Sequence, residues 1–313
     1  GIPIHFHTHD TSGINAASVL KAADAGADIC DAALASLSGT TSQPCLNSIV
    51  AALAHTPRDT ALDLATLNEF SDYWETVREF YYPFEENIKS GSAEVYHHEM
   101  PGGQYTNLRQ QARSLHLDHR WREVADAYAE VNKLFGDIVK VTPSSKVVGD
   151  MALFMVTNNL TVKDVLESPR PLNYPRSVVE MMQGMLGFPE GGWPAEIQNK
   201  VLSAAGVKPI EGRPGEHMPP VDFEGVKESL ASKIGHEPSE TDVMSYLMYP
   251  DVFIEFNRHR QSYGDTSGIP TPCFLYGPPP MEETYIDLER GKTLILKYLT
   301  TGELREDGMR TVF

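Results

Sequence analysis

The first part of the chain alternates between strand-like and helix-like patterns of hydrophobic residues. In residues 1–9, GIPIHFHTH, apolar side chains alternate with three histidines, and this period of two predicts a β-strand with both faces occupied. Small and apolar residues at helical spacing predict helices over residues 14–26 and 45–56, and residues 27–34 predict a second buried strand. A strand–helix–strand–helix order with short connections is typical of a parallel α/β sheet or barrel.

The middle of the chain has a different, mostly helical pattern. Apolar residues spaced three and four apart predict that residues 58–264 are largely α-helical. The predicted helices cover residues 66–85, 118–139, 144–159, 177–187, 194–206, 222–235 and 239–264. Residues 96–107, YHHEMPGGQYTN, are interpreted as a loop. From residue 270 onward, alternating residues with Pro and Gly turns predict short β-strands.

The alternating histidines are the first candidates for chemistry. Side chains two positions apart on a strand point to the same side, about 7 Å from one another. His7 and His9 can therefore converge on one ion at the end of the strand, where βα units place their sites. His5 is too far from His9 for all three to share a metal. The alternative is that these histidines are polar residues packed in a barrel interior. Two histidines do not complete a zinc-like site, which needs at least one more protein ligand.

A second candidate is the segment KVTPSSK, residues 140–146. It gathers hydroxyl groups and a cation in Thr142, Ser144, Ser145 and Lys146. A loop of this kind can hold an anionic group or a ureido carbonyl. The competing interpretation is an ordinary helix N-terminus, with Ser144 or Ser145 as the cap.

The charge of the chain narrows the class of partner, and its cysteine content indicates the compartment. The 313 residues carry a formal charge of −17, from 43 acidic and 26 basic side chains. Affinity for nucleic acid and for anionic lipid rests on Lys and Arg, so we expect neither nucleic acid nor a membrane as partner. Three separated cysteines predict reduced thiols in an intracellular compartment. No apolar run predicts a transmembrane helix, and no signal-peptide pattern opens the sequence.

Seven short motifs resemble the carboxyltransferase region of the pyruvate carboxylase family. They are HTHDTSG, SGTTSQP, EMPGGQYTNL, KVTPSSKVVGD, YPRSVVEMMQG, MYPDVF and LERGKTL. Each motif is weak alone, but together they follow the family's order along nearly the whole chain. The tail YIDLERGKTLILKYL is similar to the family's tetramerisation domain, which favours this family over its close cousins.

The resemblance implies an α/β fold made of three parts. Residues 1–57 would be the last βα units of a (β/α)₈ TIM barrel, with its seventh and eighth strands at residues 2–9 and 27–34. Residues 58–269 would be the helical C-terminal carboxyltransferase region, a funnel over the barrel mouth. Residues 270–313 would be the start of a small β-rich tetramerisation domain.

The resemblance also implies roles for individual residues. His7 and His9 match the two histidine ligands of a divalent metal, Mn²⁺ or Zn²⁺. Thr142 matches the threonine that passes a proton between the pyruvate methyl group and biotin. Ser145 and Lys146 match positions beside the biotin pocket. The implied reaction is that of a biotin-dependent ligase of gluconeogenesis and anaplerosis, and it transfers CO₂ from carboxybiotin to pyruvate to give oxaloacetate.

Other parts of the implied enzyme fall outside this sequence. The family's remaining metal ligands, an Asp and a carbamylated Lys, would precede Gly1, as would the residues that clamp pyruvate. The domain that uses ATP and bicarbonate and the biotin carrier domain are also outside it. We therefore expect a fragment that is inactive alone and binds metal weakly. The complete protein is expected to be a homotetramer in the cytoplasm, or in the mitochondrial matrix of a eukaryote.

Two other interpretations remain open. An oxaloacetate decarboxylase α chain or a transcarboxylase 5S-type subunit would use related chemistry in a different assembly. A non-enzymatic scaffold, in which the helices serve only assembly, belongs to a different class of protein.

Overall fold

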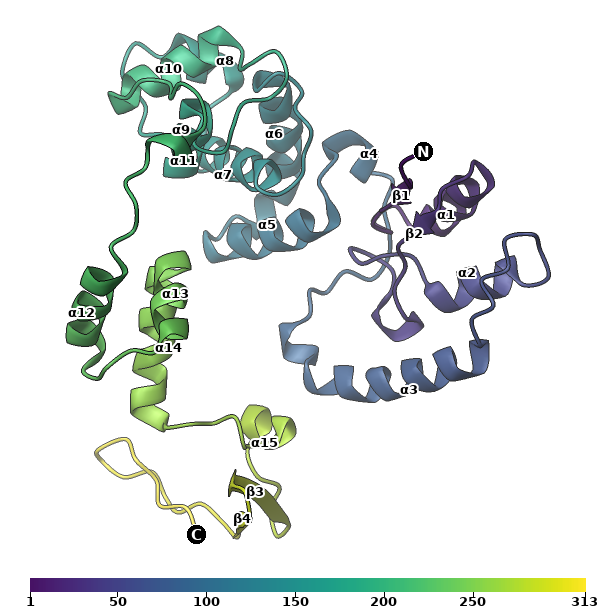
Figure 1. Ribbon diagram of the computed structural model, residues 1–313, viewed down its shortest axis with the longest axis vertical. Helices are drawn as coiled ribbons and strands as arrows, with labels where there is room; N and C mark the ends of the chain where they lie inside the picture. The colour runs from purple at the N-terminus through teal and green to yellow at the C-terminus, as the bar shows by residue number, and fades with distance from the viewer. The chain divides into compact units, whose positions relative to one another are not determined.

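The computed structural model describes residues 1–313, apart from the side chain of His217. Its contacts divide the chain into two compact units, residues 1–218 and residues 219–313 (Figure 1). The three predicted domains concern the architecture of a longer protein, and their boundaries stay predictions. Within the described part of the chain, no helix is both long enough and apolar enough to span a bilayer.

The first unit opens with the predicted strand–helix–strand–helix order. Strand β1 (His5–Phe6) pairs in parallel with β2 (Ile29–Cys30), and His5 lies opposite Ile29. Helix α1 (Asn15–Asp24) connects the two strands, and α2 (Leu46–Leu53) follows β2. Both strands are shorter than predicted, because their hydrogen-bonded ladder extends over only two residues.

An aromatic-rich helix borders this α/β segment. Helix α3 (Leu64–Phe80) packs against α2 and the 3₁₀ turn η1 (Ala35–Leu37), and a second turn, η2 (Tyr82–Phe84), follows it. Asp63 caps its N-terminus, because the carboxylate accepts a 3.0 Å hydrogen bond from the Thr66 N–H.

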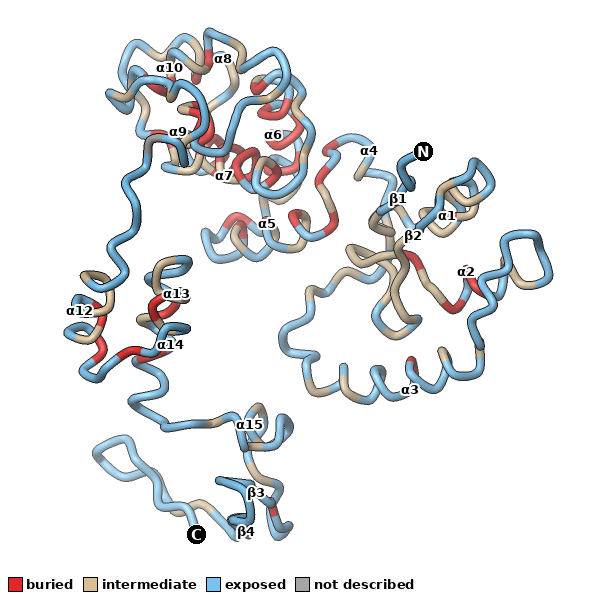
Figure 2. Tube along the Cα trace, viewed as in Figure 1, coloured by how far each residue is buried: buried red, intermediate tan, exposed pale blue. Residues whose placement is uncertain are grey.

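The rest of the first unit is helical, as predicted. Its elements are α4 (Val95–His98), α5 (Gly102–Ser114), η3 (Asp118–Arg120), α6 (Trp121–Leu134), α7 (Ser144–Thr157), α8 (Val162–Glu167), α9 (Arg176–Gln183), α10 (Ala195–Ala205) and α11 (Pro214–His217). Helices α5 to α10 enclose one hydrophobic core, in which Tyr128, Met151 and Ile197 are fully buried (Figure 2). This core holds the segment before α7 in place.

The predicted loop over residues 96–107 is wrong. This stretch contains most of α4 and the start of α5. Glycine has a low helix propensity, so Gly102 and Gly103 favour a loop prediction where a helix in fact begins. The helix forms because Leu108 and Ala112 bury completely in the core, and packing outweighs propensity.

The second unit contains helices and one hairpin. Its elements are α12 (Phe223–Ile234), α13 (Glu240–Met248), α14 (Pro250–Tyr263), α15 (Thr271–Tyr276), β3 (Glu283–Glu289) and β4 (Lys292–Lys297). The helix predicted over residues 239–264 is divided at Tyr249, because Pro250 disfavours a helical conformation in the residue before it. Strands β3 and β4 pair antiparallel, which confirms the predicted strands there, whereas residues 271–276 form a helix instead.

Candidate active site

A cavity of about 920 Å³ lies in the first unit. It is bordered by the segment after β1, the junction of α4 and α5, and the segment that leads into α7. All five predicted site residues line it: His7, His9, Thr142, Ser145 and Lys146. The structure therefore brings the histidine pair and the hydroxyl-rich segment, more than a hundred residues apart in sequence, to one cavity.

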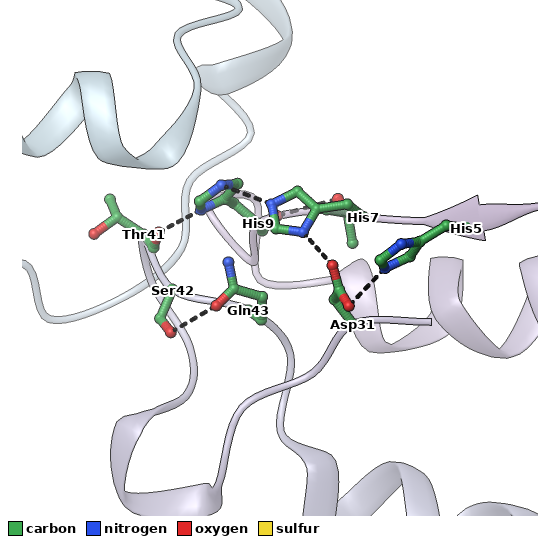
Figure 3. A network of polar contacts seen from close by, with 8 residues as sticks. His5, His7, His9, Asp31, Thr41, Ser42 and Gln43 are labelled. Atoms are coloured by element: carbon green, nitrogen blue, oxygen red, sulfur yellow. Dashed lines mark hydrogen bonds and ion pairs between the residues drawn. The ribbon is translucent and has the colours of Figure 1, made fainter. Parts of the chain in front are cut away.

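The two histidines face each other through their Nε2 atoms, which lie 3.3 Å apart (Figure 3). On the far side of each ring, His9 Nδ1 lies 2.7 Å from the carbonyl oxygen of Thr41, and His7 Nδ1 lies 2.6 Å from Asp31 Oδ2. A carbonyl or carboxylate oxygen only accepts hydrogen bonds, so in each neutral ring the proton is on Nδ1. Two Nε2 lone pairs then point at each other.

This arrangement fits two ligands of one metal ion. Two lone pairs cannot hydrogen-bond to one another, so either a metal cation between them or a proton on one ring would stabilise the contact. Two metal–nitrogen bonds of about 2.05 Å at a roughly tetrahedral angle place the nitrogens about 3.3 Å apart. The hydrogen bonds at Nδ1 are those that orient metal-bound histidines in general.

The histidine pair is only part of a metal site. Among the residues that the structure describes, no group of three or more His, Cys, Asp and Glu side chains could hold an ion. The nearest carboxylate, Asp31, uses its oxygens on His5 and on the outer side of His7. A metal held here needs further ligands.

Sequence reasoning missed Asp31. The hydrogen bonds from His5 and then His7 hold the pKa of this carboxyl below its usual range, so it is ionised beside them. A signal was present, because parallel pairing of β1 with β2 places His5 opposite Ile29. Two residues beyond this pair in each segment, the same register brings His7 beside Asp31.

Close packing at the start of α5 fixes His9. A Cβ atom on Gly102 would overlap the carbonyl oxygen of Thr41 and would lie 2.5 Å from His9 Nδ1. Only glycine therefore allows α5 to begin against the hydrogen bond between His9 and Thr41. The hydroxyl of Thr106, one turn into α5, donates to Thr41 Oγ1 at 2.9 Å.

The segment before α7 presents Thr142 to the cavity. The Thr142 side chain is exposed, and local contacts hold the turn around it. Ser144 Oγ contacts the carbonyl oxygens of Val139 and Val141 at 2.8 and 2.6 Å. No side chain caps α7, so the prediction that Ser144 or Ser145 acts as the cap is wrong.

An ion pair joins this segment to the α4–α5 junction. Lys140 Nζ donates to Glu99 Oε2 at 2.7 Å, and the hydrogen bond from Lys140 lowers the pKa of Glu99. Both residues line the cavity. The Lys140 side chain is only 11% exposed, so the pair ties two cavity walls together.

Two predicted residues follow Thr142 on α7. Ser145 is buried, and its carbonyl oxygen accepts a 3.3 Å hydrogen bond from the Tyr128 hydroxyl. Lys146 pairs with Asp150 at 2.7 Å, and Asp150 also accepts a 2.5 Å hydrogen bond from Ser177. The Lys146 ammonium is thereby held by one carboxylate, which leaves other N–H donors available.

Gln104 is a further cavity residue that sequence reasoning missed. The residue is 8% exposed, and its Nε2 atom is buried without a hydrogen-bond partner among the described residues. An unpaired buried donor is costly unless something satisfies it. Gln104 lines the cavity, but its Nε2 atom lies toward Gly149, so a bound molecule reaches this donor only if the side chain turns.

Comparisons with known proteins show the family to which the chain is similar. The family model described as "Conserved carboxylase domain" matches residues 95–297. Over 100% of this chain, identity is 50% to pyruvate carboxylase 1 of Caenorhabditis elegans, 47% to pyruvate carboxylase of Bacillus subtilis and 45% to human mitochondrial pyruvate carboxylase. The chain spans 27%, 27% and 26% of these relatives.

A solved structure matches as well. The carboxyl transferase domain from Rhizobium etli pyruvate carboxylase, with pyruvate and biocytin, is similar with a TM-score of 0.92 and 52% sequence identity. The match covers 100% of this chain and 52% of that one.

Proposed function

The chain belongs to the conserved carboxylase domain family, and on that premise we propose that it is the carboxyltransferase part of a pyruvate carboxylase. In this role it moves a carboxyl group from carboxybiotin to pyruvate and gives oxaloacetate. The observation that carries the proposal is the shared cavity, in which a histidine pair with facing lone pairs and the Thr142 hydroxyl meet. The R. etli domain with pyruvate and biocytin supports the substrates.

In the proposed site, His7 and His9 hold a divalent metal through Nε2. The 3.3 Å separation and the two Nδ1 hydrogen bonds support this assignment. When bound, the metal supplies Lewis-acid stabilisation of the negative oxygen that develops on pyruvate. Mn²⁺ and Zn²⁺ both suit imidazole with carboxylate-type ligands. The resemblance implies that an Asp and a carbamylated Lys of the longer protein complete the ligand set.

Thr142 is proposed to move the proton. A hydroxyl both donates and accepts hydrogen bonds, so one group can serve two reactants. As the carboxyl group leaves biotin as CO₂, the ureido nitrogen takes the Thr142 proton, and Thr142 regains a proton from the pyruvate methyl group. The resulting enolate carbon then bonds to CO₂. This is positioned acid–base catalysis, and the exposed place of Thr142 on the cavity wall supports it.

Three neighbours are proposed to bind the substrates. Lys146 and Ser145 lie beside the biotin ring, where the N–H groups of Lys146 that Asp150 leaves unused can donate to the ureido carbonyl oxygen. Gln104 lines the same cavity, and a turn of its side chain would bring its unpaired Nε2 donor to a carbonyl or carboxylate oxygen there.

We further propose how the chain fits a longer protein. The segment from β1 to α2 would complete a (β/α)₈ barrel as its last two βα units, and residues 58–269 would form the helical funnel. The 92% exposure of Ile2 and the 63% exposure of Ile4 support added strands beside β1. Residues 270–313 would begin the tetramerisation domain of a homotetramer, and the biotin carrier domain would deliver its biotin to the cavity. The proposed compartment is the cytoplasm, or the mitochondrial matrix in a eukaryote.

The proposal is tested on the complete protein that contains this chain. Given pyruvate, bicarbonate and MgATP, it should form oxaloacetate, and avidin should abolish the activity by sequestering biotin. ATP-independent decarboxylation of oxaloacetate, with no ATP-driven synthesis, would support the oxaloacetate decarboxylase alternative. The absence of both activities would overturn the proposal in favour of a scaffold.

A further inference from the structure

We propose that Asp31 and His5 form a positioning pair that sets the orientation of His7 toward the metal. The inference rests on the proposed metal-binding role of His7. The Asp31 carboxylate is divided between two imidazoles, with Oδ1 2.7 Å from His5 Nε2 and Oδ2 2.6 Å from His7 Nδ1 (Figure 3). His5 thus fixes the Asp31 carboxylate, and this carboxylate in turn fixes the His7 ring.

His7 and His9 differ in what orients them. His9 Nδ1 donates to a backbone carbonyl, that of Thr41, which the chain itself fixes. His7 donates to a side chain, and a carboxylate can rotate away unless its second oxygen is also held. A second hydrogen bond to Asp31 is therefore needed to keep the contact with His7 occupied.

The arrangement explains the alternating histidines of the first segment. A period of two puts His5 and His7 on the same side, and the parallel register places Asp31 beside both of them. Strand geometry separates His5 from His9 by about 13 Å, too far for a common ion. The third histidine is thus a support for the ligand pair and not a third ligand.

Asp31 acts on His7 in two ways. A carboxylate on Nδ1 keeps the proton there and leaves Nε2 free to bind metal, and it also fixes the plane of the ring. Loss of such an outer partner typically weakens metal binding 10- to 100-fold. Asparagine at this position can turn its own N–H toward Nδ1, which would move the ring proton to Nε2 and block the metal.

The test compares variants of the complete protein by metal content and by metal affinity in chelator competition. Asp31→Asn should bind Mn²⁺ about 10- to 100-fold more weakly than wild type. His5→Ala should show a smaller loss, and His5→Gln, whose amide can still donate to Asp31, should recover most of it. The matched control is His97→Ala, from an exposed pair in which His97 lies 3.0 Å from Asp126 and neither residue lines the cavity. Its metal affinity should equal that of wild type.

The outcomes separate this inference from the proposed function. If His7→Ala removes the metal while Asp31→Asn and His5→Ala both bind it as tightly as wild type, the positioning pair is overturned and the function stands. If the double variant His7→Ala, His9→Ala keeps its full metal content, the metal role and the positioning pair both fall. If Asp31→Asn does not fold, the metal affinities of His5→Ala and His5→Gln are compared. Weaker binding in His5→Ala that His5→Gln restores supports the positioning pair, and wild-type affinity in both variants overturns it.

Discussion

Lys140 Nζ lies 2.7 Å from Glu99 Oε2, and this ion pair ties the segment that carries Thr142 to the junction of α4 and α5. Glu99 has a φ of +55°, in the left-handed region that non-glycine residues rarely adopt. Glu99 is the C-cap of α4, and a left-handed residue commonly ends a helix. The ion pair therefore constrains the segment that carries Thr142 relative to the α4–α5 junction.

Replacing Glu99 by Gln should lower kcat for oxaloacetate formation by about tenfold, because a small misplacement of a catalytic group costs one to two orders of magnitude. The control is Glu237→Gln, which removes a 3.0 Å ion pair with Lys227 in the second unit. That variant should keep wild-type kcat. Steady-state kinetics of the complete protein measures both, and an unchanged kcat in Glu99→Gln would show that the pair has no positioning role.

Gly102 and Gly103 provide a matched comparison at the start of α5. Gly102→Ala should destabilise the protein by about 1–3 kcal/mol, because the added methyl group collides with Thr41 and His9. It should also weaken metal binding through the displacement of His9. Gly103→Ala meets nothing within 4 Å, and alanine should stabilise the helix by up to about 1 kcal/mol. Thermal unfolding and elemental analysis check both, and equal effects at the two positions would contradict this packing argument.

His98 should make stability depend on pH. It is buried, its Nδ1 accepts a 3.0 Å hydrogen bond from the Met100 N–H, and burial lowers its pKa. The unfolded chain then binds a proton below about pH 6.5 that the folded chain resists, so this group's contribution is full above that pH and is lost as pH falls through the folded pKa. One group changes the free energy of unfolding by at most about 1.4 kcal/mol per pH unit.

The measurement is thermal unfolding of the chain at pH 7.5 and pH 5.5. His98→Asn keeps an acceptor for the Met100 N–H and cannot be protonated in this range. Its melting temperature should therefore fall less than that of wild type between the two pH values. His119→Asn, at an exposed position, serves as the control and should follow wild type. A wild-type pH dependence in His98→Asn would assign the effect to other groups.

The sequence predicted the βα segment and most helices because their cores follow simple periodicity. The period of two identified the face of His7 and His9, and the helical spacing identified α6, α7 and α10. The prediction failed where tertiary contact decides. Helix α5 begins with two glycines that are poor helix formers, and Gly102 is present because the backbone approaches His9 there.

Only part of the candidate site could be predicted from the sequence, for a similar reason. The histidines and Thr142 stand in motifs, but their partners come from elsewhere in the fold. Asp31 follows β2, Glu99 follows α4, and Gln104 lies on a helix that looked like a loop. Asp31 could have been found from the strand register, whereas no local pattern links Glu99 to Lys140.

The central claim is that the Thr142 hydroxyl carries the proton between pyruvate and biotin. The most direct measurement compares two rates in the complete protein: oxaloacetate formation from pyruvate, and the ATP-dependent carboxylation of biotin. Thr142→Ala should lower the first by about 10²- to 10⁴-fold and leave the second intact, because only the first needs the relay. Thr142→Ser, which keeps the hydroxyl, should retain substantial oxaloacetate formation. Unchanged oxaloacetate formation in Thr142→Ala would contradict the account.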